Sequence, residues 1–128
     1  MRILAIDPGS RYLGLALAED EIKIAMPYGV LEIKCHEDLF GKLEEIIARE
    51  KIGKIVIGRP IGLSGRETEQ TKNTDHFIEE VKQKIKLPVV IVDERLTSKM
   101  ADKLLSNKAE NHAVAAGIIL QNYLDKEV

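Results

Sequence analysis

The chain has 128 residues, of which 45% are hydrophobic and 31% charged, with a formal net charge of −2 and one cysteine. This length is typical of one domain, and the apolar fraction argues against a disordered chain, a collagen-like repeat and a coiled coil. One cysteine excludes a disulfide framework, and no apolar stretch reaches the roughly 18–20 residues that span a bilayer. We therefore expect a single domain over residues 1–128, intracellular and without a membrane segment.

The charge balance limits the kinds of nucleic-acid protein that the chain can be. Proteins that coat nucleic acid non-specifically carry a strong basic excess, because counterion release drives their binding. Here 19 Lys and Arg are balanced by 21 Asp and Glu. A nucleic-acid enzyme therefore requires its basic residues to be clustered around its acids.

Three predicted strands open the chain. Residues 2–7 form a short apolar run that ends at a Pro-Gly pair, and residues 13–18 form a second apolar run. Residues 22–33 alternate loosely and contain a proline and a glycine, which favours a peripheral strand. We expect two hairpin-like connections between these three strands.

Helices and strands alternate in the rest of the chain, because the apolar period changes at about residue 37. The first predicted elements are a helix from about residue 37 that ends at Gly53, a strand over 54–57 that Gly58-Arg59-Pro60 stops, and a Gly-rich loop over 62–66. A second helix follows, whose apolar stripe runs from Phe77 to Ile85, and then a strand over 89–92. The last predicted elements are a short helix after Thr97 or Ser98 to about Leu105 and a final helix from about residue 110.

This order of elements predicts one mixed sheet. Antiparallel hairpins followed by right-handed crossovers give a sheet covered by helices on both faces, a three-layer α/β domain. The continuous apolar run over 89–92 predicts a strand that is buried on both faces.

Charged side chains end three of the predicted strands. Asp7 ends the first, Arg59 follows the fourth, and Asp93-Glu94-Arg95 ends the fifth. Sheets of α/β proteins place their sites at the carboxyl ends of strands. Asp7 has a second interpretation as a turn residue before Pro-Gly, and Glu94 a second one as a solvated strand end paired with Arg95.

Carboxylates that converge at one sheet edge repel one another, and a divalent cation relieves the repulsion. Carboxylates bind Mg²⁺ or Mn²⁺ through hard oxygens and leave positions open for phosphate oxygens. Two such ions, roughly 3.5–4 Å apart, stabilise the attacking and leaving oxygens of an in-line phosphoryl displacement. The acids therefore suggest phosphodiester chemistry with Mg²⁺ or Mn²⁺.

Basic residues near the strand ends and their exit loops are candidates for phosphate contacts, because they focus positive potential around an acidic centre. Solvated charges without a ligand are the competing interpretation. The candidates are Arg11, Arg59, Arg66, Lys72, Arg95 and Lys99.

Four segments of the chain, in order, resemble the signature blocks of the YqgF/RuvX family. They are Asp7-Pro-Gly-Ser-Arg-Tyr-Leu-Gly-Leu-Ala16, Gly58-Arg-Pro60, Asp93-Glu-Arg-Leu-Thr97 and the ending Ala115-Ala-Gly-Ile-Ile-Leu-Gln-Asn-Tyr-Leu124. The resemblance covers essentially the whole chain. The segments over 93–97 and 115–124 are more specific to the family than the first segment is.

The resemblance implies a ribonuclease-H-like fold, related to RuvC-type Holliday-junction resolvases, with a five-stranded mixed sheet in the order 3-2-1-4-5. It implies a cytoplasmic nuclease that trims the 5′ end of precursor 16S ribosomal RNA, as a monomer or homodimer. The alternative assignment within the family is resolution of Holliday junctions in branched DNA.

The family pattern also implies a site. Asp7 is then the first metal ligand, and Glu94, together with Asp93, supplies the second acid. The fifth strand lies two strand spacings from the first, roughly 10 Å, which favours the longer Glu94 over Asp93. The third acid of the family falls at His112, so the expected catalytic set is Asp7, Glu94 and His112.

Two other functions remain open at this stage. Actin-like and sugar-kinase nucleotide-binding domains also open with Asp-x-Gly and a hairpin, but they need two such domains. A catalytically weak RNA-binding or scaffold domain is the non-enzymatic alternative, and His112 in place of an acid is its main support. The segment Cys35-His36-Glu37-Asp38 has the wrong spacing for structural zinc and is more typical of a helix start.

Overall fold

The computed structural model describes residues 1–9, 11–61, 67–94 and 108–126. Five strands form one sheet in the order β3-β2-β1-β4-β5, as the family resemblance implies. The strands are β1 (Arg2–Pro8), β2 (Tyr12–Glu19), β3 (Met26–Glu32), β4 (Ile52–Pro60) and β5 (Val89–Glu94).

The first three strands are antiparallel neighbours, whereas β4 and β5 run parallel to β1. Ile6 pairs with Ile57 on β4, and Gly58 pairs with Val92 on β5. The carboxyl ends of β1, β4 and β5 therefore lie at the same edge of the sheet. Asp7, which follows Ile6, belongs to this edge.

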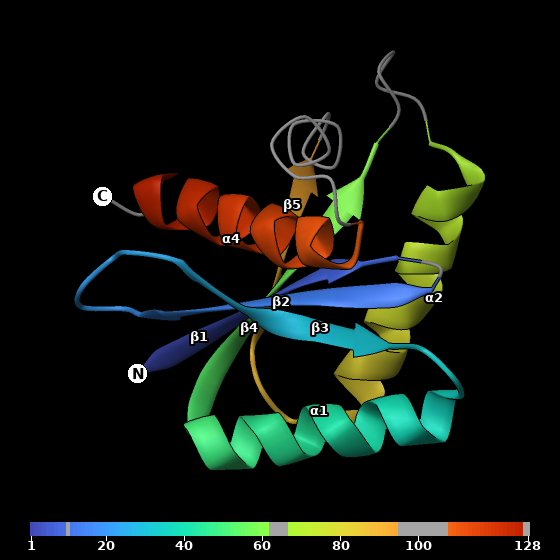
Figure 1. Ribbon diagram of the computed structural model, residues 1–128, viewed down its shortest axis with the longest axis horizontal. Helices are drawn as coiled ribbons and strands as arrows, with labels where there is room; N and C mark the ends of the chain where they lie inside the picture. The colour runs from blue at the N-terminus through green and yellow to red at the C-terminus, as the bar shows by residue number, and fades with distance from the viewer. Residues whose placement is uncertain (10, 62–66, 95–107, 127–128) are drawn as a thin grey trace.

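Helices cover both faces of the sheet (Figure 1), in three layers. Helices α1 (His36–Glu50) and α2 (Glu69–Lys84) lie on one face, and α4 (Lys108–Lys126) crosses the other. The α1/α2 face packs around Leu4, Ile6 and Ile57, and the α4 face around Ile3, Ala5 and Val56. Odd-numbered residues of β1 therefore face α4, because successive strand residues point to opposite faces.

Local signals explain where α1 and α2 begin. Glu37 and Asp38 lie in the first turn of α1, where carboxylates complement the helix dipole. Thr68 caps α2 in a reciprocal arrangement with Thr71, in which each side chain accepts a hydrogen bond from the other's backbone N–H. In the part of the chain that is described, no helix is long and apolar enough to cross a bilayer.

Two predicted element bounds need correction, and one predicted helix is not tested. Helix α1 ends at Glu50, where Lys51 adopts a left-handed conformation (φ 55°), so Gly53 lies inside β4. The third strand begins at Met26 rather than at residue 22, because a turn bonds the N–H of Lys23 to the carbonyl of Glu19. The short helix predicted up to Leu105 lies outside the described residues.

Strand β5 is also less buried than the sequence predicts. It is the edge strand of the sheet, and Ile91 is 41% exposed, whereas Val92 is buried under α4. The apolar run is buried on one face, because the described helices leave the other face of β5 partly open.

Candidate active site

A carboxylate and an imidazole from opposite ends of the chain meet at the carboxyl end of β1. Oδ2 of Asp7 lies 3.3 Å from Nδ1 of His112, across 105 residues of sequence. Asp7 ends the buried odd-numbered face of β1, and His112 lies in the first turns of α4. Both side chains are largely buried, with 13% of Asp7 and 27% of His112 exposed.

Two glycines allow α4 to approach the β1–β2 hairpin this closely. A Cβ on Gly14 would overlap the backbone carbonyl of His112, and one on Gly9 would lie 3.0 Å from Cε1 of its ring. The Tyr12 ring lies 6.0 Å from that of His112, centroid to centroid. The glycines of the first block therefore position the imidazole.

Burial raises the pKa of the Asp7 carboxyl, and the hydrogen bond and charge of His112 act in the opposite direction. Desolvation is the larger effect, because a carboxylate away from water is unfavourable without a compensating cation. The site therefore has a buried acid whose charge one imidazole compensates only in part.

Of the two acids predicted on β5, the structure describes the side chain of Asp93 but only the backbone of Glu94. Asp93 is exposed, and Oδ1 lies 3.7 Å from Nη1 of Arg59, which belongs to the α2 side of the sheet. Asp7 faces α4, so the structure does not bring Asp93 and Asp7 together. The backbone of Glu94 pairs with Pro60 at the end of β5, and its side chain lies outside the described atoms.

Arg59 is bound by carboxylates. Its guanidinium donates to Asp75 on α2 at 2.8 Å and to Glu67 at 2.6 Å, in addition to the contact with Asp93. These hydrogen bonds raise the pKa of Arg59, and the same contact lowers that of Asp75. A phosphate at this guanidinium would have to displace the carboxylates, so the structure gives Arg59 a structural part that the sequence did not suggest.

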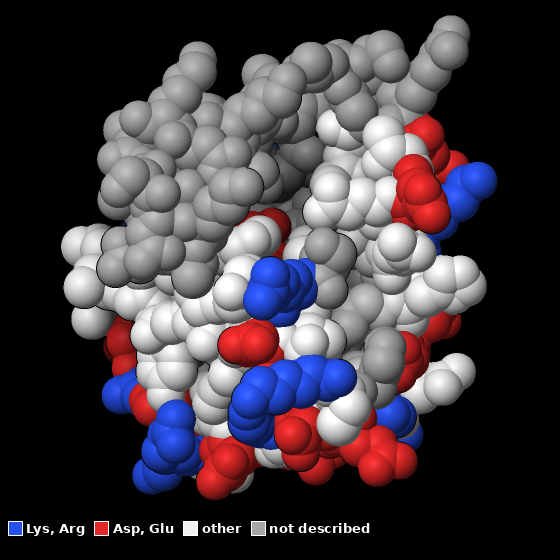
Figure 2. Space-filling view, turned by 45° about the vertical axis from the view of Figure 1, so that its right-hand side comes forward, with Lys and Arg blue, Asp and Glu red and all other residues white. Residues whose placement is uncertain are grey.

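Of the other predicted phosphate contacts, the structure describes Arg11 and Lys72, and both are exposed. Arg11 is exposed and its guanidinium lies 5.7 Å from the centroid of the Tyr12 ring, beside the His112 ring. Lys72 is exposed on α2. Arg66, Arg95 and Lys99 lie outside the described residues. On the described part of the face shown in Figure 2, basic and acidic side chains are interspersed.

Within the described residues, no group of three or more His, Cys, Asp or Glu side chains gathers as a metal site. The pair of Asp7 and His112 supplies one oxygen and one nitrogen donor. Sequence reasoning found both residues, but it missed the part that Gly9 and Gly14 play. The signal was present in the Asp-Pro-Gly-x4-Gly spacing, which has meaning only once α4 is known to cross that hairpin.

Comparison with known proteins places the chain in a family. A family model described as "RuvX: Holliday junction resolvase" matches residues 1–126. Relatives named "Putative pre-16S rRNA nuclease" include one from Dictyoglomus turgidum, 40% identical over 98% of this chain and 94% of its own length. Another, from Maridesulfovibrio salexigens, is 36% identical over 97% of this chain and 98% of its own length.

Solved structures show the same fold at low sequence identity. Thermus thermophilus RuvC in complex with a Holliday junction substrate matches with a TM-score of 0.64 at 16% identity, over 99% of this chain and 95% of that one. Fowlpox virus resolvase with Holliday junction DNA matches with a TM-score of 0.61 at 7% identity, over 100% and 99%. The sheet order and the helices on both faces are thus those of a ribonuclease-H-like domain. The chain belongs to the RuvX family, a family of phosphodiester-cleaving nucleases.

Proposed function

We propose that this chain is a divalent-metal-dependent nuclease that hydrolyses phosphodiester bonds at the 5′ end of precursor 16S ribosomal RNA in the cytoplasm. The names of its relatives support the substrate. The observation that carries the chemistry is the buried contact between Asp7 and His112 at the carboxyl end of β1.

The donor atoms of this pair lie close enough to share one cation, because Oδ2 of Asp7 lies 3.3 Å from Nδ1 of His112. A cation would also compensate the buried carboxylate, whose pKa burial raises. An oxygen and an imidazole nitrogen suit Mn²⁺ as well as Mg²⁺.

In this proposal Asp7 and His112 hold the cation, and Glu94 at the end of β5 completes the acidic set. When bound, the metal supplies charge stabilisation of the phosphoryl oxygens and an activated water. His112 binds as a neutral imidazole, with Gly14 fixing the position of its backbone.

Branched DNA is the second candidate substrate. The family description and the resolvase complexes of the same fold favour it. A catalytically weak RNA-binding domain is the third, since the described residues hold two donors rather than a larger set.

One experiment separates the three. Purified protein is incubated with end-labelled precursor 16S RNA and with a synthetic four-way DNA junction, each with Mn²⁺, with Mg²⁺ and with chelator. We expect metal-dependent shortening of the RNA and an uncut junction. Cleavage of the junction alone would favour the resolvase, and binding without cleavage of either would favour the RNA-binding domain. Asp7→Asn protein, prepared identically, controls for contaminating nuclease.

A further inference from the structure

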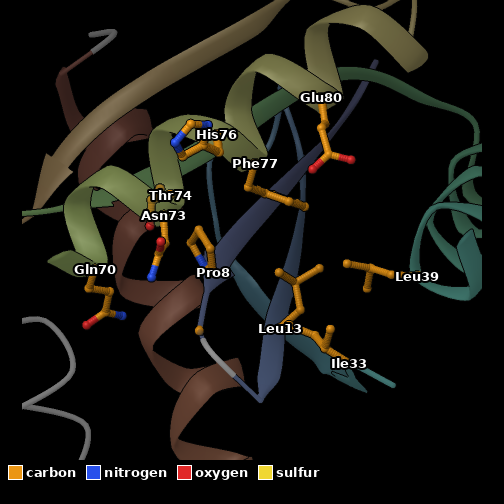
Figure 3. Close-up of a pocket in the computed structure, with 11 residues that line it drawn as sticks. Pro8, Leu13, Ile33, Leu39, Gln70, Asn73, Thr74, His76, Phe77 and Glu80 are labelled. Atoms are coloured by element: carbon orange, nitrogen blue, oxygen red, sulfur yellow. The ribbon is translucent and has the colours of Figure 1, made fainter. Parts of the chain in front are cut away.

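A pocket opens on the other face of the sheet, beside the same end of β1 (Figure 3). It has a volume of about 370 Å³ and lies between the β1–β2 hairpin, the start of α1 and one side of α2. This volume is within the range of small-molecule sites. Pro8 and Gly9, directly after Asp7, form part of its wall.

The lining combines an apolar floor with polar groups, one of which is the carboxylate of Glu80. Leu13, Ile33, Leu39 and Phe77 form the apolar part. Helix α2 contributes a polar stripe of Gln70, Asn73, Thr74, His76 and Glu80. Figure 3 shows Asn73 and Glu80 extending from α2 towards the strands.

Thr74 is the member of this stripe that best indicates a ligand. It is 3% exposed, and among the described residues no hydrogen bond joins its hydroxyl to a side chain or backbone group. Buried polar groups are nearly always hydrogen-bonded, so an orphaned hydroxyl in a pocket wall indicates a missing partner. A polar ligand atom in the pocket would supply it.

We propose that this pocket receives one unpaired nucleobase of the substrate strand, next to the phosphate that is cleaved. Amide and hydroxyl side chains both donate and accept, as the edges of a base require, and apolar side chains contact its flat faces. The proposal rests on the proposed nuclease function and adds a preference for substrates with an unpaired nucleotide at the site.

The charges favour a base over a phosphate. None of the described residues that line the pocket is Lys or Arg, and Glu80 contributes a carboxylate. A phosphate would lie near this carboxylate, which is paired with Lys84 of α2 (Nζ–Oε2 3.7 Å), whereas the amino groups of a base can donate hydrogen bonds to it. The ligand chemistry is therefore that of a neutral hydrogen-bonding ring.

The position of Pro8 and Gly9 connects the pocket to Asp7. Asp7 faces α4, and Pro8, the next residue, faces the pocket. A Cβ on Gly9 would approach the carbonyl of Tyr12 to 2.6 Å, so the chain turns tightly here and presents little bulk. A nucleic-acid strand that crosses this edge can have its phosphate at Asp7 and the adjacent base on the other side.

The test measures binding rather than turnover. Full-length protein carrying Asp7→Asn binds a short single-stranded RNA that is scanned with one abasic site at a time. We expect one position, adjacent to the cleaved bond, at which loss of the base weakens binding about tenfold. A 2-aminopurine at that position should change its fluorescence on binding.

The pocket variants Thr74→Val and Asn73→Ala should weaken binding of the intact RNA and remove the effect of the abasic site. Gln83→Ala, which removes an exposed amide of α2 outside the pocket, is the matched control. Thr74→Val should fold with undiminished stability, because the described residues offer the hydroxyl no hydrogen bond that the variant would lose. The slope of log affinity against log salt should stay unchanged, since no phosphate contact is lost.

A flat abasic scan, or an equal loss in Thr74→Val and Gln83→Ala, would overturn the pocket assignment, as would a failure of the RNA to bind. Cleavage of the same RNA by the unaltered protein with Mn²⁺ is assayed in parallel. A flat scan with intact cleavage refutes the base pocket alone. A position-specific abasic effect without cleavage refutes the nuclease and leaves the base pocket standing.

Discussion

The backbone carbonyl of His112 occupies the space that a side chain on Gly14 would need. The two residues belong to α4 and β2, and their contact sets how deeply α4 lies over the β1–β2 hairpin. The position of the imidazole beside Asp7 therefore depends on a hydrogen atom in place of a methyl group at residue 14.

We expect Gly14→Ala to lower the free energy of unfolding by roughly 1–3 kcal/mol, the usual cost of inserting a methyl into a packed interior. The obstacle is backbone, which cannot rotate away, so cleavage should fall as well. Gly41→Ala is the control, because a Cβ there meets nothing and alanine favours the interior of α1. It should raise stability by about 0.5–1 kcal/mol. Denaturant unfolding measures the free energy of unfolding of both variants. Equal changes in Gly14→Ala and Gly41→Ala would contradict the close contact between residue 14 and His112.

Asp7→Asn should abolish metal-dependent cleavage without unfolding the protein. The pKa of Asp7 is raised in the folded state, so ionised Asp7 costs stability. The cost is absent at a pH below the ordinary pKa of an Asp carboxyl. It grows as the pH rises through the raised pKa that Asp7 has in the folded protein. The asparagine variant should therefore gain stability relative to the parent across this interval, with chelator present.

Unfolding midpoints of the parent and of Asp7→Asn across that pH range measure the effect. Asp125→Asn, at an exposed carboxylate of α4, should show no such divergence. A stability advantage of the parent that grows with pH would contradict the assignment of desolvation as the dominant effect.

His112→Asp should shift the metal preference. Imidazole nitrogen favours transition metals, whereas an added carboxylate oxygen suits Mg²⁺. The ratio of cleavage rates in Mn²⁺ and Mg²⁺ should therefore fall in the variant. The ratio is independent of the amount of folded protein, since one preparation is assayed in both ions. An unchanged ratio would show that His112 is not a metal ligand.

Arg59→Met should act on stability. The guanidinium joins α2 to the end of β4 through Asp75, and its loss leaves this carboxylate without its partner. We expect a loss on the order of 1 kcal/mol at neutral pH. The pKa of Asp75 is lowered in the folded state. The stabilisation by the Arg59–Asp75 pair is therefore present at a pH above the ordinary pKa of an Asp carboxyl, and it is lost as the pH falls through the lowered pKa of Asp75. Parent and variant should converge in acid, which thermal unfolding at graded pH would test.

Arg11→Ala should act on nucleic-acid binding. Arg11 is exposed beside Tyr12 and the His112 ring. Loss of one phosphate contact should reduce the slope of log affinity against log salt by about 0.7–0.9. Arg49→Ala, an exposed arginine on α1 bonded to Tyr28, is the matched control and should leave the slope unchanged. Equal slopes for Arg11→Ala and the parent would place the substrate elsewhere.

The strands and most helices were predictable because apolar runs and turn residues are local signals, whereas the order of the strands in the sheet was implied by the family resemblance. The end of α1 was not predictable, because Lys51 adopts the left-handed conformation that glycine usually supplies, two residues before Gly53. The exposure of Ile91 depends on which strand lies at the sheet edge, which the apolar run itself does not record.

The candidate site was predictable in part for a similar reason. The pairing of His112 with Asp7 followed from the family spacing, and the structure brings the two side chains together. The carboxylates around Arg59 come from α2, β5 and the segment before α2, and no sequence spacing links them. The pocket beside Pro8 was not predictable from the sequence, because its lining residues form no motif and are typical of helices and hairpins.

The separation of 105 residues between Asp7 and His112 has a consequence for the newly made protein. At about 5–20 residues per second, a ribosome needs several seconds after adding Asp7 to reach His112. Helix α4 contacts every strand of the sheet, so the site forms only after α4 has been synthesised. A nascent chain that has not yet reached α4 thus lacks the contact between Asp7 and His112.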